Sequence, residues 1–434
     1  MAQKPSSPKG ALAAHRGLLL DAIREAGQVS RAALARKTGL NAATVTLAIR
    51  DLLADGLIVE TGLAPSTGGK PAVLLALATE SRFAVGVHLD HTSITYVAAN
   101  LSGGVIDRQF SRGGADAGDP QRVVERIAAE ITTFVRRAGI DRERLVGIGL
   151  VSPGPATSAR GIALSSPEMR PWVDFPLVTA LATAAGLPVV LGNDATASAI
   201  GEYWTGHAKA TDVFATVYMG TGIGAGIVMA GRPMIGSSGN AGEVGHTCVV
   251  VNGERCWCGA DGCLETVAGA AAIVGQARAA GLSPSGEFLD EQFADVARAA
   301  LRDNPAAVRI FEDAAQYVAV AVQSLANVLD LDRVILTGPS FGIAGALYVP
   351  TIRRRLEHAF FARNAHAVEV TMSANATVAA ATGAAAMVLQ RELAPLPSMS
   401  GRVAVVAVGS EPPKRPGPAA PSAHLALAGD HVTG

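Results

Sequence analysis

Three of the four cysteines of this chain lie close together in one glycine-rich segment. They are Cys256, Cys258 and Cys263, and His246 stands just upstream of them. Thiolate sulfur and imidazole nitrogen are ligands that suit zinc, and a closed site of three cysteines and one histidine is tetrahedral and structural. Cys256 and Cys258, separated by one residue, are badly placed to form a disulfide. The spacing therefore favours a structural Zn²⁺ site over the alternative, which is three free cysteines in a loop.

The length and charge of the chain limit what it can do. With 434 residues it can hold two or three domains. Its formal net charge of −1 argues against general attraction to nucleic acid, so any DNA binding must come from one local module. No apolar run is long enough to cross a bilayer, and charged residues interrupt the apolar part of the N-terminus, unlike in a signal peptide. Few cysteines with a metal-type spacing fit a reducing compartment, so we expect a cytoplasmic protein that does not bind membranes.

The N-terminal region has the pattern of a winged helix-turn-helix domain. We expect this domain at residues 15–78, after a flexible arm at residues 1–14. Apolar residues at helical spacing end near Gly27, and two shorter helices follow, which Ser30 and Asn41 can N-cap. A first helix followed by two short helices that a turn joins is the helix-turn-helix arrangement.

A basic wing follows the helices. Two strand-like runs, at residues 57–60 and 72–77, enclose a turn in which Lys70 could enter a minor groove. The last short helix offers little base-reading chemistry, because Arg50 is its only cation. The alternative is a three-helix bundle that contacts protein. Because helix, turn, helix and wing occur together, we favour double-stranded DNA as the partner. The expected DNA contacts are Arg31, Arg36, Lys37, Asn41, Thr44, Thr46, Arg50 and Lys70.

Residues 82–394 have the pattern of an α/β domain, and residues 395–434, rich in Pro, Gly and Ala, are expected to be disordered. Three strand-like runs followed by alternating helices and strands occur twice, which predicts two similar lobes with a ligand cleft between them. A glycine-rich loop, Met219–Gly226, either faces phosphate with its backbone N–H groups or is a plain hairpin turn. The expected strands are 83–90, 93–101, 104–111, 145–154, 188–194, 212–220, 224–231, 232–238, 333–338 and 367–373, and the expected helices are 120–138, 268–280 and 305–330.

Several motifs of this chain resemble those of one family, called ROK after repressor, open reading frame and kinase. They are STGGKPA behind the helix-turn-helix, VSPGP at 151–155, GNDATASAIGE at 192–202, GTGIGAGI at 220–227, GNAGEVGH at 239–246 and CWCGADGCLE at 256–265. The similarity covers nearly all of residues 15–390. It implies a two-lobed actin/hexokinase-like (ribonuclease H-like) fold, a structural zinc, a sugar in the cleft, and homodimers or homotetramers.

The resemblance also implies roles for individual residues. It makes Asn193, Asp194, Glu243, His246 and Glu265 the sugar ligands, and His246, Cys256, Cys258 and Cys263 the zinc ligands. Carboxylates and an amide suit sugar hydroxyls, and buried polar groups reject analogues that leave them without partners. His246 would bind zinc with one ring nitrogen and a hydroxyl with the other. In kinases of the family, the residue at Asp194 would be the general base.

One departure from the family concerns phosphoryl transfer. The kinases carry an Asp-x-Gly-Gly-Thr loop, whose Asp acts through magnesium and whose glycines let backbone N–H groups approach phosphate. This chain has His88-Leu89-Asp90-His91-Thr92 instead, and Asp90 would repel phosphate. The surviving remnant of the phosphate loop is Gly220, Thr221 and Gly222. We therefore expect no bound ATP or Mg²⁺ and no catalysis.

These features together predict a DNA-binding transcriptional regulator, a repressor, controlled by a sugar or sugar phosphate in a degenerate kinase domain. The alternative is an ATP-dependent sugar kinase of the same family that carries a DNA-binding head. A third class is a scaffold whose N-terminal bundle binds protein and has no salt-dependent affinity for DNA.

Overall fold

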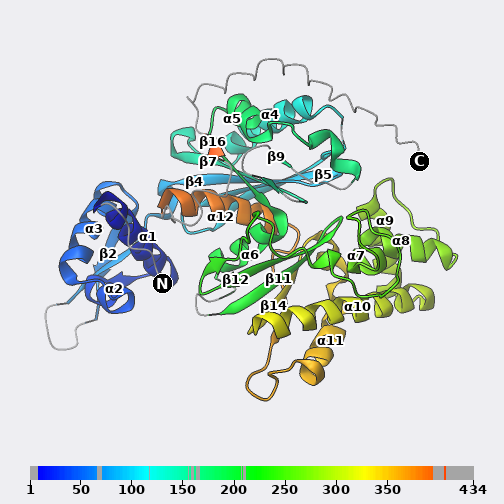
Figure 1. Cartoon of the computed structure of the whole chain (residues 1–434). Coiled ribbons are helices and arrows are strands. Elements are labelled where there is room, and N and C mark those ends of the chain that lie inside the picture. The colour runs from blue at the N-terminus through cyan, green and yellow to red at the C-terminus, as the bar shows by residue number, and fades with distance from the viewer. Residues whose placement is uncertain are drawn as a thin grey trace, which may run out of the picture.

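A computed structural model describes residues 8–65, 71–116, 118–154, 156–157, 161–162, 167–206, 208, 212–393 and 405–406. The chain forms a small N-terminal domain and two larger lobes, which lie one above the other in Figure 1. Helix α12 (Ala379–Leu393) passes between the two lobes.

The N-terminal domain is a winged helix-turn-helix. Its helices are α1 (Pro8–Ala26), α2 (Arg31–Thr38) and α3 (Ala42–Ala54), and its sheet has the order β1 (Val29–Ser30), β3 (Val73–Leu77), β2 (Ile58–Leu63). Ser30 and Asn41 cap α2 and α3 as predicted, since their side chains accept hydrogen bonds from the backbone N–H groups of Ala33 and Thr44. The expected arm is shorter than predicted: residues 8–14 belong to α1, because this stretch consists largely of strong helix formers, Ala and Leu among them.

The upper lobe contains a sheet of six strands. Their order is β16 (Val405–Val406), β10 (Val189–Asn193), β7 (Leu145–Ser152), β4 (Phe83–Leu89), β5 (Ser93–Asn100), β6 (Val105–Arg112). Helices α4 (Pro120–Arg137) and α5 (Leu177–Ala185) cover one face, and α12 covers the other (Figure 1). Val405 and Val406, which we expected to be disordered, pair with β10 because they continue its apolar sheet. A short ribbon joins β8 (Ala156–Thr157) to β9 (Gly161–Ile162).

The lower lobe repeats this plan around a sheet of five strands. Their order is β13 (Arg232–Pro233), β12 (Ile223–Met229), β11 (Val213–Met219), β14 (Arg333–Thr337), β15 (Glu369–Met372). One face packs against α7 (Leu264–Ala268), α8 (Ala270–Ala279), α9 (Leu289–Leu301), α10 (Pro305–Leu329) and α11 (Pro339–Ala359). Helix α6 (Asp194–Trp204) covers the other. The strand expected at 232–238 is only two residues long, because the chain leaves the sheet after Pro233.

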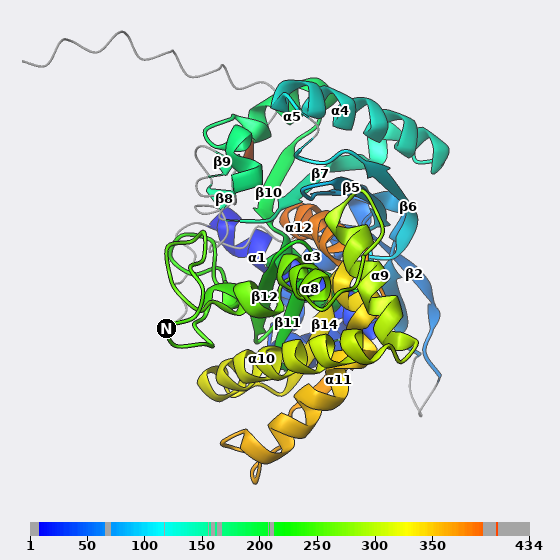
Figure 2. The ribbon, with the colours of Figure 1, turned by 90° about the vertical axis from the view of Figure 1, so that its right-hand side faces the viewer.

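Helices α6 and α12 pack against each other between the two sheets, and Figure 2 shows α12 at the centre of the molecule. Glycines make this contact possible. A Cβ atom on Gly383 of α12 would lie 1.6 Å from the carbonyl oxygen of Ala197 in α6. A Cβ on Gly149 of β7 would lie 1.9 Å from the Ala384 oxygen, and one on Gly226 of β12 would lie 2.2 Å from the Ala195 oxygen. The backbones of the two lobes therefore touch through α6 and α12 with no room for a side chain.

A search of the described residues for helices long and apolar enough to cross a membrane finds none.

Because α6 and α12 are so closely packed, adding one methyl group at their contact should change the stability of the fold strongly. Gly383→Ala should lower the free energy of unfolding by about 2 kcal/mol, because overpacking a backbone contact outweighs the gain in helix propensity. Gly275→Ala, inside α8 with nothing within 4 Å of the new Cβ, is the matched control and should raise it by about 1 kcal/mol. Urea unfolding measures both. Equal effects of the two substitutions would contradict the packing described here.

Candidate functional site

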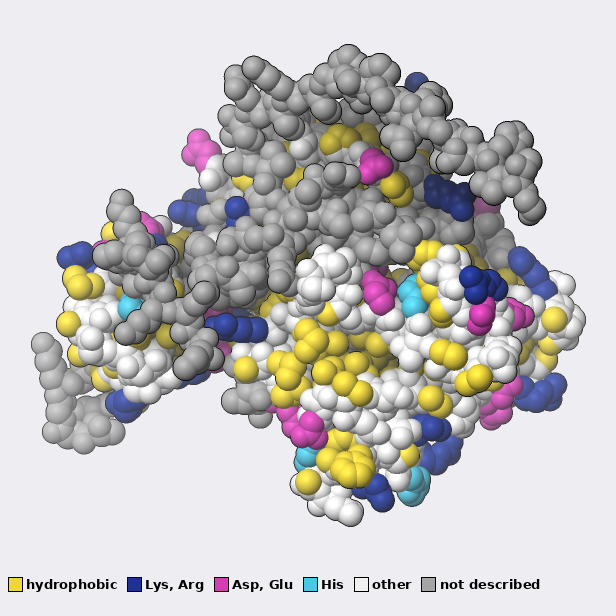
Figure 3. All heavy atoms as spheres, in the orientation of Figure 1, with side chains coloured by type: hydrophobic (Ala, Val, Ile, Leu, Met, Phe, Trp, Pro, Cys, Tyr) yellow, Lys and Arg dark blue, Asp and Glu magenta, His cyan; other side chains and the backbone are white. Residues whose placement is uncertain are grey.

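A cavity of about 380 Å³ lies between the two lobes, and both lobes line it. All five residues named above as sugar ligands meet there. Asn193 and Asp194 come from the end of β10 and the start of α6 in the upper part, and Glu243, His246 and Glu265 come from the lower lobe. In Figure 3 an acidic and a histidine side chain lie side by side near the hollow between the lobes. Residues far apart in the sequence thus form one polar cavity.

The start of α6 fixes the two upper residues. Asn193 is the N-cap, and its Oδ1 accepts a hydrogen bond of 3.0 Å from the backbone N–H of Thr196. Asp194 follows as the first helical residue, with its Oδ1 2.7 Å from the backbone nitrogen of Ala195. Both side chains are buried. A carboxylate is stabilised at this position because the helix dipole is positive at the N-terminus.

The lower lobe adds two carboxylates. Glu265 accepts hydrogen bonds from the backbone N–H of Ile223 at 3.2 Å and from the indole N–H of Trp257 at 3.0 Å. Burial, followed by the charges of Asp194 and Glu265, raises the pKa of Glu243 to about 7. Among the described residues that line the cavity there is no Lys or Arg. The cavity therefore suits a ligand with many hydroxyl groups and opposes an anionic one.

Trp257 is a cavity residue that the sequence reasoning did not identify. Its ring lines the cavity and stands edge-on to His246, with 4.9 Å between the ring centroids. Its position in the sequence, between Cys256 and Cys258, could have identified it. A residue between two ligands of a cluster that borders the cavity lies near that cavity. Its hydrogen bond to Glu265 holds one of the expected sugar ligands in position.

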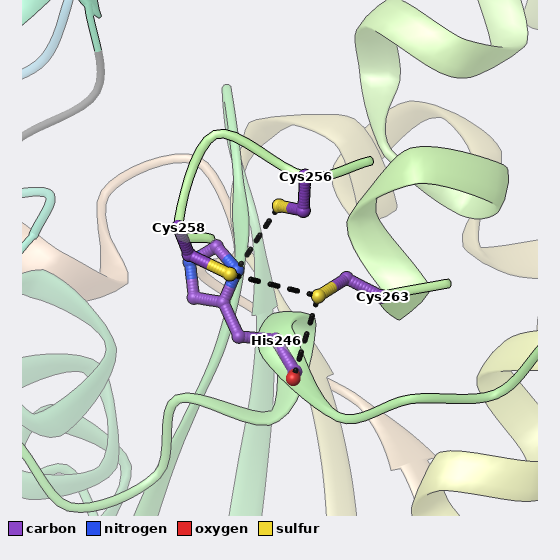
Figure 4. A group of neighbouring side chains, drawn as sticks. All are labelled: His246, Cys256, Cys258 and Cys263. Carbon is purple, nitrogen blue, oxygen red and sulfur yellow. Dashed lines mark hydrogen bonds between the residues drawn. The ribbon is translucent and has the colours of Figure 1, made fainter. Parts of the chain in front are cut away.

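The predicted metal ligands form a compact cluster. The ligand atoms of His246, Cys256, Cys258 and Cys263 all lie within 4.8 Å of one another, and Figure 4 shows their side chains pointing toward a common centre. Nδ1 of His246 is 3.6 Å from Sγ of Cys256, and the sulfur atoms of Cys258 and Cys263 are 3.7 Å apart. All four cysteines of the chain are free thiols. Three thiols and one imidazole at these distances can hold a metal ion, and they suit zinc.

Asp90 lies beside the turn of the glycine-rich loop. Oδ1 of Asp90 accepts hydrogen bonds from the Thr221 hydroxyl at 3.1 Å and from the backbone N–H of His91 at 2.8 Å. Residues 220–222 form the turn of the β11–β12 hairpin, so the glycine-rich loop is a hairpin turn whose threonine faces Asp90. The carboxylate of Asp90 is therefore bound directly to this turn.

His88 pairs with Asp194, one of the residues that line the cavity. It is buried, and its Nε2 lies 3.5 Å from Oδ2 of Asp194. Burial lowers the pKa of the imidazole, but contact with Asp194 and the negative charge of Asp90 outweigh it, so the pKa of His88 is raised. A protonated His88 would form an ion pair with the carboxylate of Asp194.

The expected DNA contacts lie on the winged helix-turn-helix, apart from Lys70, which lies outside the described residues. Thr46, Leu47 and Arg50 are on the exposed side of α3, as predicted. Three of the expected cations already form exposed ion pairs within the domain: Arg31 with Glu60, Lys37 with Glu25 and Arg50 with Asp51. Asn41 and Thr44 are joined in the α3 cap, Thr46 bonds to the Ala42 carbonyl, and Arg36 is exposed. Exposed ion pairs are weak, so these cations can exchange their partners for phosphates.

Comparisons with known proteins agree with this architecture. Residues 84–391 match the ROK family, and residues 14–59 match a winged helix-turn-helix DNA-binding family. The xylose repressor of Caldicellulosiruptor bescii is 27% identical over 380 residues, which cover 86% of this chain and 94% of the repressor. A crystal structure of a ROK family transcriptional regulator, described as a homologue of the Escherichia coli Mlc protein, superposes with a TM-score of 0.72 at 27% identity, covering 89% of this chain and 98% of the regulator.

A kinase of the same family is also similar. The glucokinase of Streptomyces griseus, in complex with glucose and AMPPNP, superposes with a TM-score of 0.59 at 27% identity, covering 70% of this chain and 98% of the kinase. The ROK match spans more than half of the chain, so the chain belongs to the ROK family. With its N-terminal winged helix-turn-helix, it is a DNA-binding transcriptional regulator of that family.

The cysteine cluster predicts a metal-dependent fold. Cys258→Ser should remove bound zinc and lower the free energy of unfolding by several kcal/mol, because loss of a structural metal is among the few single-site changes with so large an effect. Cys248→Ser, an exposed cysteine outside the cluster, is the control and should retain both metal and stability. Elemental analysis and thermal unfolding measure the two effects. An unchanged metal content in Cys258→Ser would refute the assignment.

The raised pKa of Glu243 predicts a dependence of stability on pH. The folded chain holds this proton up to about pH 7, whereas an ordinary glutamate loses it near 4.5. The contribution to stability is therefore present below pH 4.5 and is lost as pH rises through 7. Glu243→Gln stays neutral, so its stability relative to the wild type should increase between about pH 5 and pH 8. Urea unfolding across this range measures it, and a constant difference would show that Glu243 titrates normally.

Proposed function

We propose that this regulator is a repressor controlled by a sugar that binds in the cavity between its lobes. The observation that carries the proposal is the meeting of Asn193, Asp194, Glu243, His246 and Glu265 in one cavity of a chain that also has a DNA-binding domain. Carboxylates accept strong hydrogen bonds from hydroxyl groups. A sugar or a sugar phosphate is the class of effector considered, and the acidic lining favours the uncharged form. Because relatives include a xylose repressor, xylose is the first sugar to test.

The chain acts as a regulator without phosphoryl transfer. The contact of Asp90 with Thr221 and the pairing of His88 with Asp194 support this proposal. The first places negative charge beside the turn that would cradle phosphate, and the second engages the side chain that would serve as the base. ATP and Mg²⁺ then have no role in its action.

Zinc, in this proposal, is structural. His246, Cys256, Cys258 and Cys263 would hold it, and it would fix the orientation of the His246 ring, so that the other ring nitrogen can meet a sugar hydroxyl. Free thiols with metal-type spacing fit a protein that works in the reducing cytoplasm. A homodimer or homotetramer would present two winged helices to an operator with an inverted repeat.

Control of DNA binding requires that the sugar bind one arrangement of the lobes better than another. Two contacts already join the lobes. Asp90 meets Thr221 beside the cavity, and Arg112 of β6 forms ion pairs with Asp290 and Glu291 at the start of α9, at 2.9 and 2.8 Å. A sugar held by residues of both lobes would favour the closed arrangement. Closure would then change the spacing of the DNA-binding heads in the dimer.

Asp194→Asn tests the separation of the two sites. Loss of the charge should weaken sugar binding about tenfold or more, because a hydrogen bond to a charged group contributes about 1.5–3 kcal/mol. Affinity for operator DNA without sugar should change much less than the affinity for the sugar. Calorimetric titration with the sugar and fluorescence anisotropy with DNA measure the two affinities. Glu312→Gln, at an exposed position of α10, is the control. An equal loss of affinity for the sugar and for DNA would contradict the proposal that the two ligands bind at separate sites.

The enzyme alternative makes a different prediction. A sugar kinase with a DNA-binding head would release ADP with at least one sugar of a panel, whereas the proposed regulator releases none. The glycine-rich turn between β11 and β12 is the observation that favours this alternative. A scaffold that binds protein would show no salt-dependent affinity for DNA, which a titration at two salt concentrations tests.

A further inference from the structure

Helix α6 runs from the cavity to the DNA-binding domain. Its first residue is Asp194 in the cavity, and its last two residues, Tyr203 and Trp204, contact helix α1 of the winged helix-turn-helix. All eleven residues between Asp194 and Trp204 inclusive are buried. At about 1.5 Å per residue, this helix spans about 16 Å. One continuous helix therefore contacts both the cavity and the DNA-binding domain.

The contact at the far end of α6 is made by Arg24, in the last turn of α1. Its Nη1 donates a hydrogen bond of 3.0 Å to the backbone carbonyl of Trp204. Its guanidinium carbon lies 4.8 Å from the centre of the Trp204 ring and 5.1 Å from that of Tyr203. The hydroxyl of Tyr203 donates to Glu25, the next residue of α1, at 3.3 Å. Arg24 is thus held between two aromatic rings and the end of a helix.

This position suits a cation for two physical reasons. The last carbonyls of a helix lack partners within the helix, and the helix dipole is negative at that end. Arg24 satisfies one such carbonyl of α6, while Asp194 places an anion at the positive end of the same helix. A guanidinium over aromatic faces gains a cation–π attraction that strengthens when water is excluded. The side chain of Arg24 is 7% exposed, so the contact is largely dry.

The contact is also incompletely satisfied. Nε and Nη2 of Arg24 are buried and have no hydrogen-bond partner within the described part of the chain, although Nε lies 3.6 Å from Oδ1 of Asp21. Buried donors without acceptors cost free energy. A shift of α1 on α6 that brings acceptors to these two donors would recover part of that free energy.

Helix α6 can transmit a movement because it is packed tightly against its neighbours. Gly383 of α12 and Gly226 of β12 touch its backbone at Ala197 and Ala195. A densely packed helix moves as a unit instead of absorbing a displacement in side-chain rearrangements. A shift at Asp194 must therefore reach Trp204, whose carbonyl carries Arg24.

We propose that Arg24 is a positioning residue that transmits the state of the cavity to the DNA-binding domain through helix α6. The proposal rests on the proposed function, because it assigns the route by which the sugar site would act. When the ligand draws Asp194 toward it, α6 moves, and its C-terminal end carries Arg24 and the last turn of α1 with it. Helices α2 and α3 pack against α1 and therefore change their orientation to DNA.

The first experiment measures the coupling itself in the full chain. The affinity for a selected genomic DNA fragment is determined with and without D-xylose, and then with D-glucose and N-acetylglucosamine. We expect the sugar to change the wild-type affinity by about tenfold or more, within the usual range of allosteric coupling. Arg24→Ala should bring this ratio close to one while zinc content and sugar affinity without DNA remain. Arg24→Lys keeps the charge at the helix end but cannot stack as a plane, so it should keep part of the ratio.

Arg16→Ala is the matched control. Arg16 lies on the same helix as Arg24, but its ion pair is with Asp55 at the end of α3, inside the DNA-binding domain. It should change the ratio little, even if it lowers the stability of α1. A wild-type ratio in Arg24→Ala, or an equal loss in Arg16→Ala, would overturn the proposal.

A second measurement needs no ligand, so it separates this proposal from the proposed function. Amide hydrogen exchange is followed in residues 19–26 of α1 for the wild type, Asp194→Asn, Arg24→Ala and the double variant. Asp194→Asn should raise exchange in α1 several-fold in the wild-type background and add nothing in the Arg24→Ala background. Unchanged exchange in Asp194→Asn would overturn the route through α6, whichever sugar binds. If no sugar alters DNA affinity but this coupling is present, the proposed function fails and the route stands.

Discussion

The backbone contact between α6 and α12 is the constraint on which the rest of the structure depends. Glycines at 149, 226 and 383 let the two sheets approach these helices at distances that exclude any side chain. This packing sets the start of α6 at the cleft between the lobes, where Asn193 and Asp194 face the acidic residues of the lower lobe. It also sets the end of α6 against the DNA-binding domain. The cavity and the contact with α1 are two consequences of one close approach.

The same fold serves kinases and regulators, and a few side chains distinguish this chain from a kinase. A sugar kinase needs a site that binds phosphate and a carboxylate that accepts the proton of the attacking hydroxyl. Here Asp90 contacts the turn at Thr221, and His88 lies beside Asp194. In the proposed function, the polar groups of the cavity bind a sugar, and these two contacts oppose phosphoryl transfer.

Much of the site could be predicted from the sequence because its chemistry is local or belongs to a recognisable motif. The cysteine spacing predicted the cluster, the caps Ser30 and Asn41 predicted two helices, and the family motifs named the five cavity residues. Helices α6 and α12 escaped prediction because they are buried on nearly all sides, so their residues show no alternation of polar and apolar faces. The contacts of Trp257 and Arg24 could not be predicted either. Both contacts depend on which distant element the fold places beside an aromatic ring. The spacing of polar and apolar residues in the sequence does not contain that information.

In the proposed function, a sugar in the cavity determines which DNA sites this regulator binds. The most direct test is selection of fragmented genomic DNA by the folded, zinc-loaded protein at near-physiological salt, with and without each sugar of a panel, followed by sequencing of the bound fragments. The account predicts a few enriched fragments that share an inverted repeat and are released, or bound more tightly, with one uncharged sugar. The absence of enriched fragments, or enrichment that no sugar changes, would contradict it.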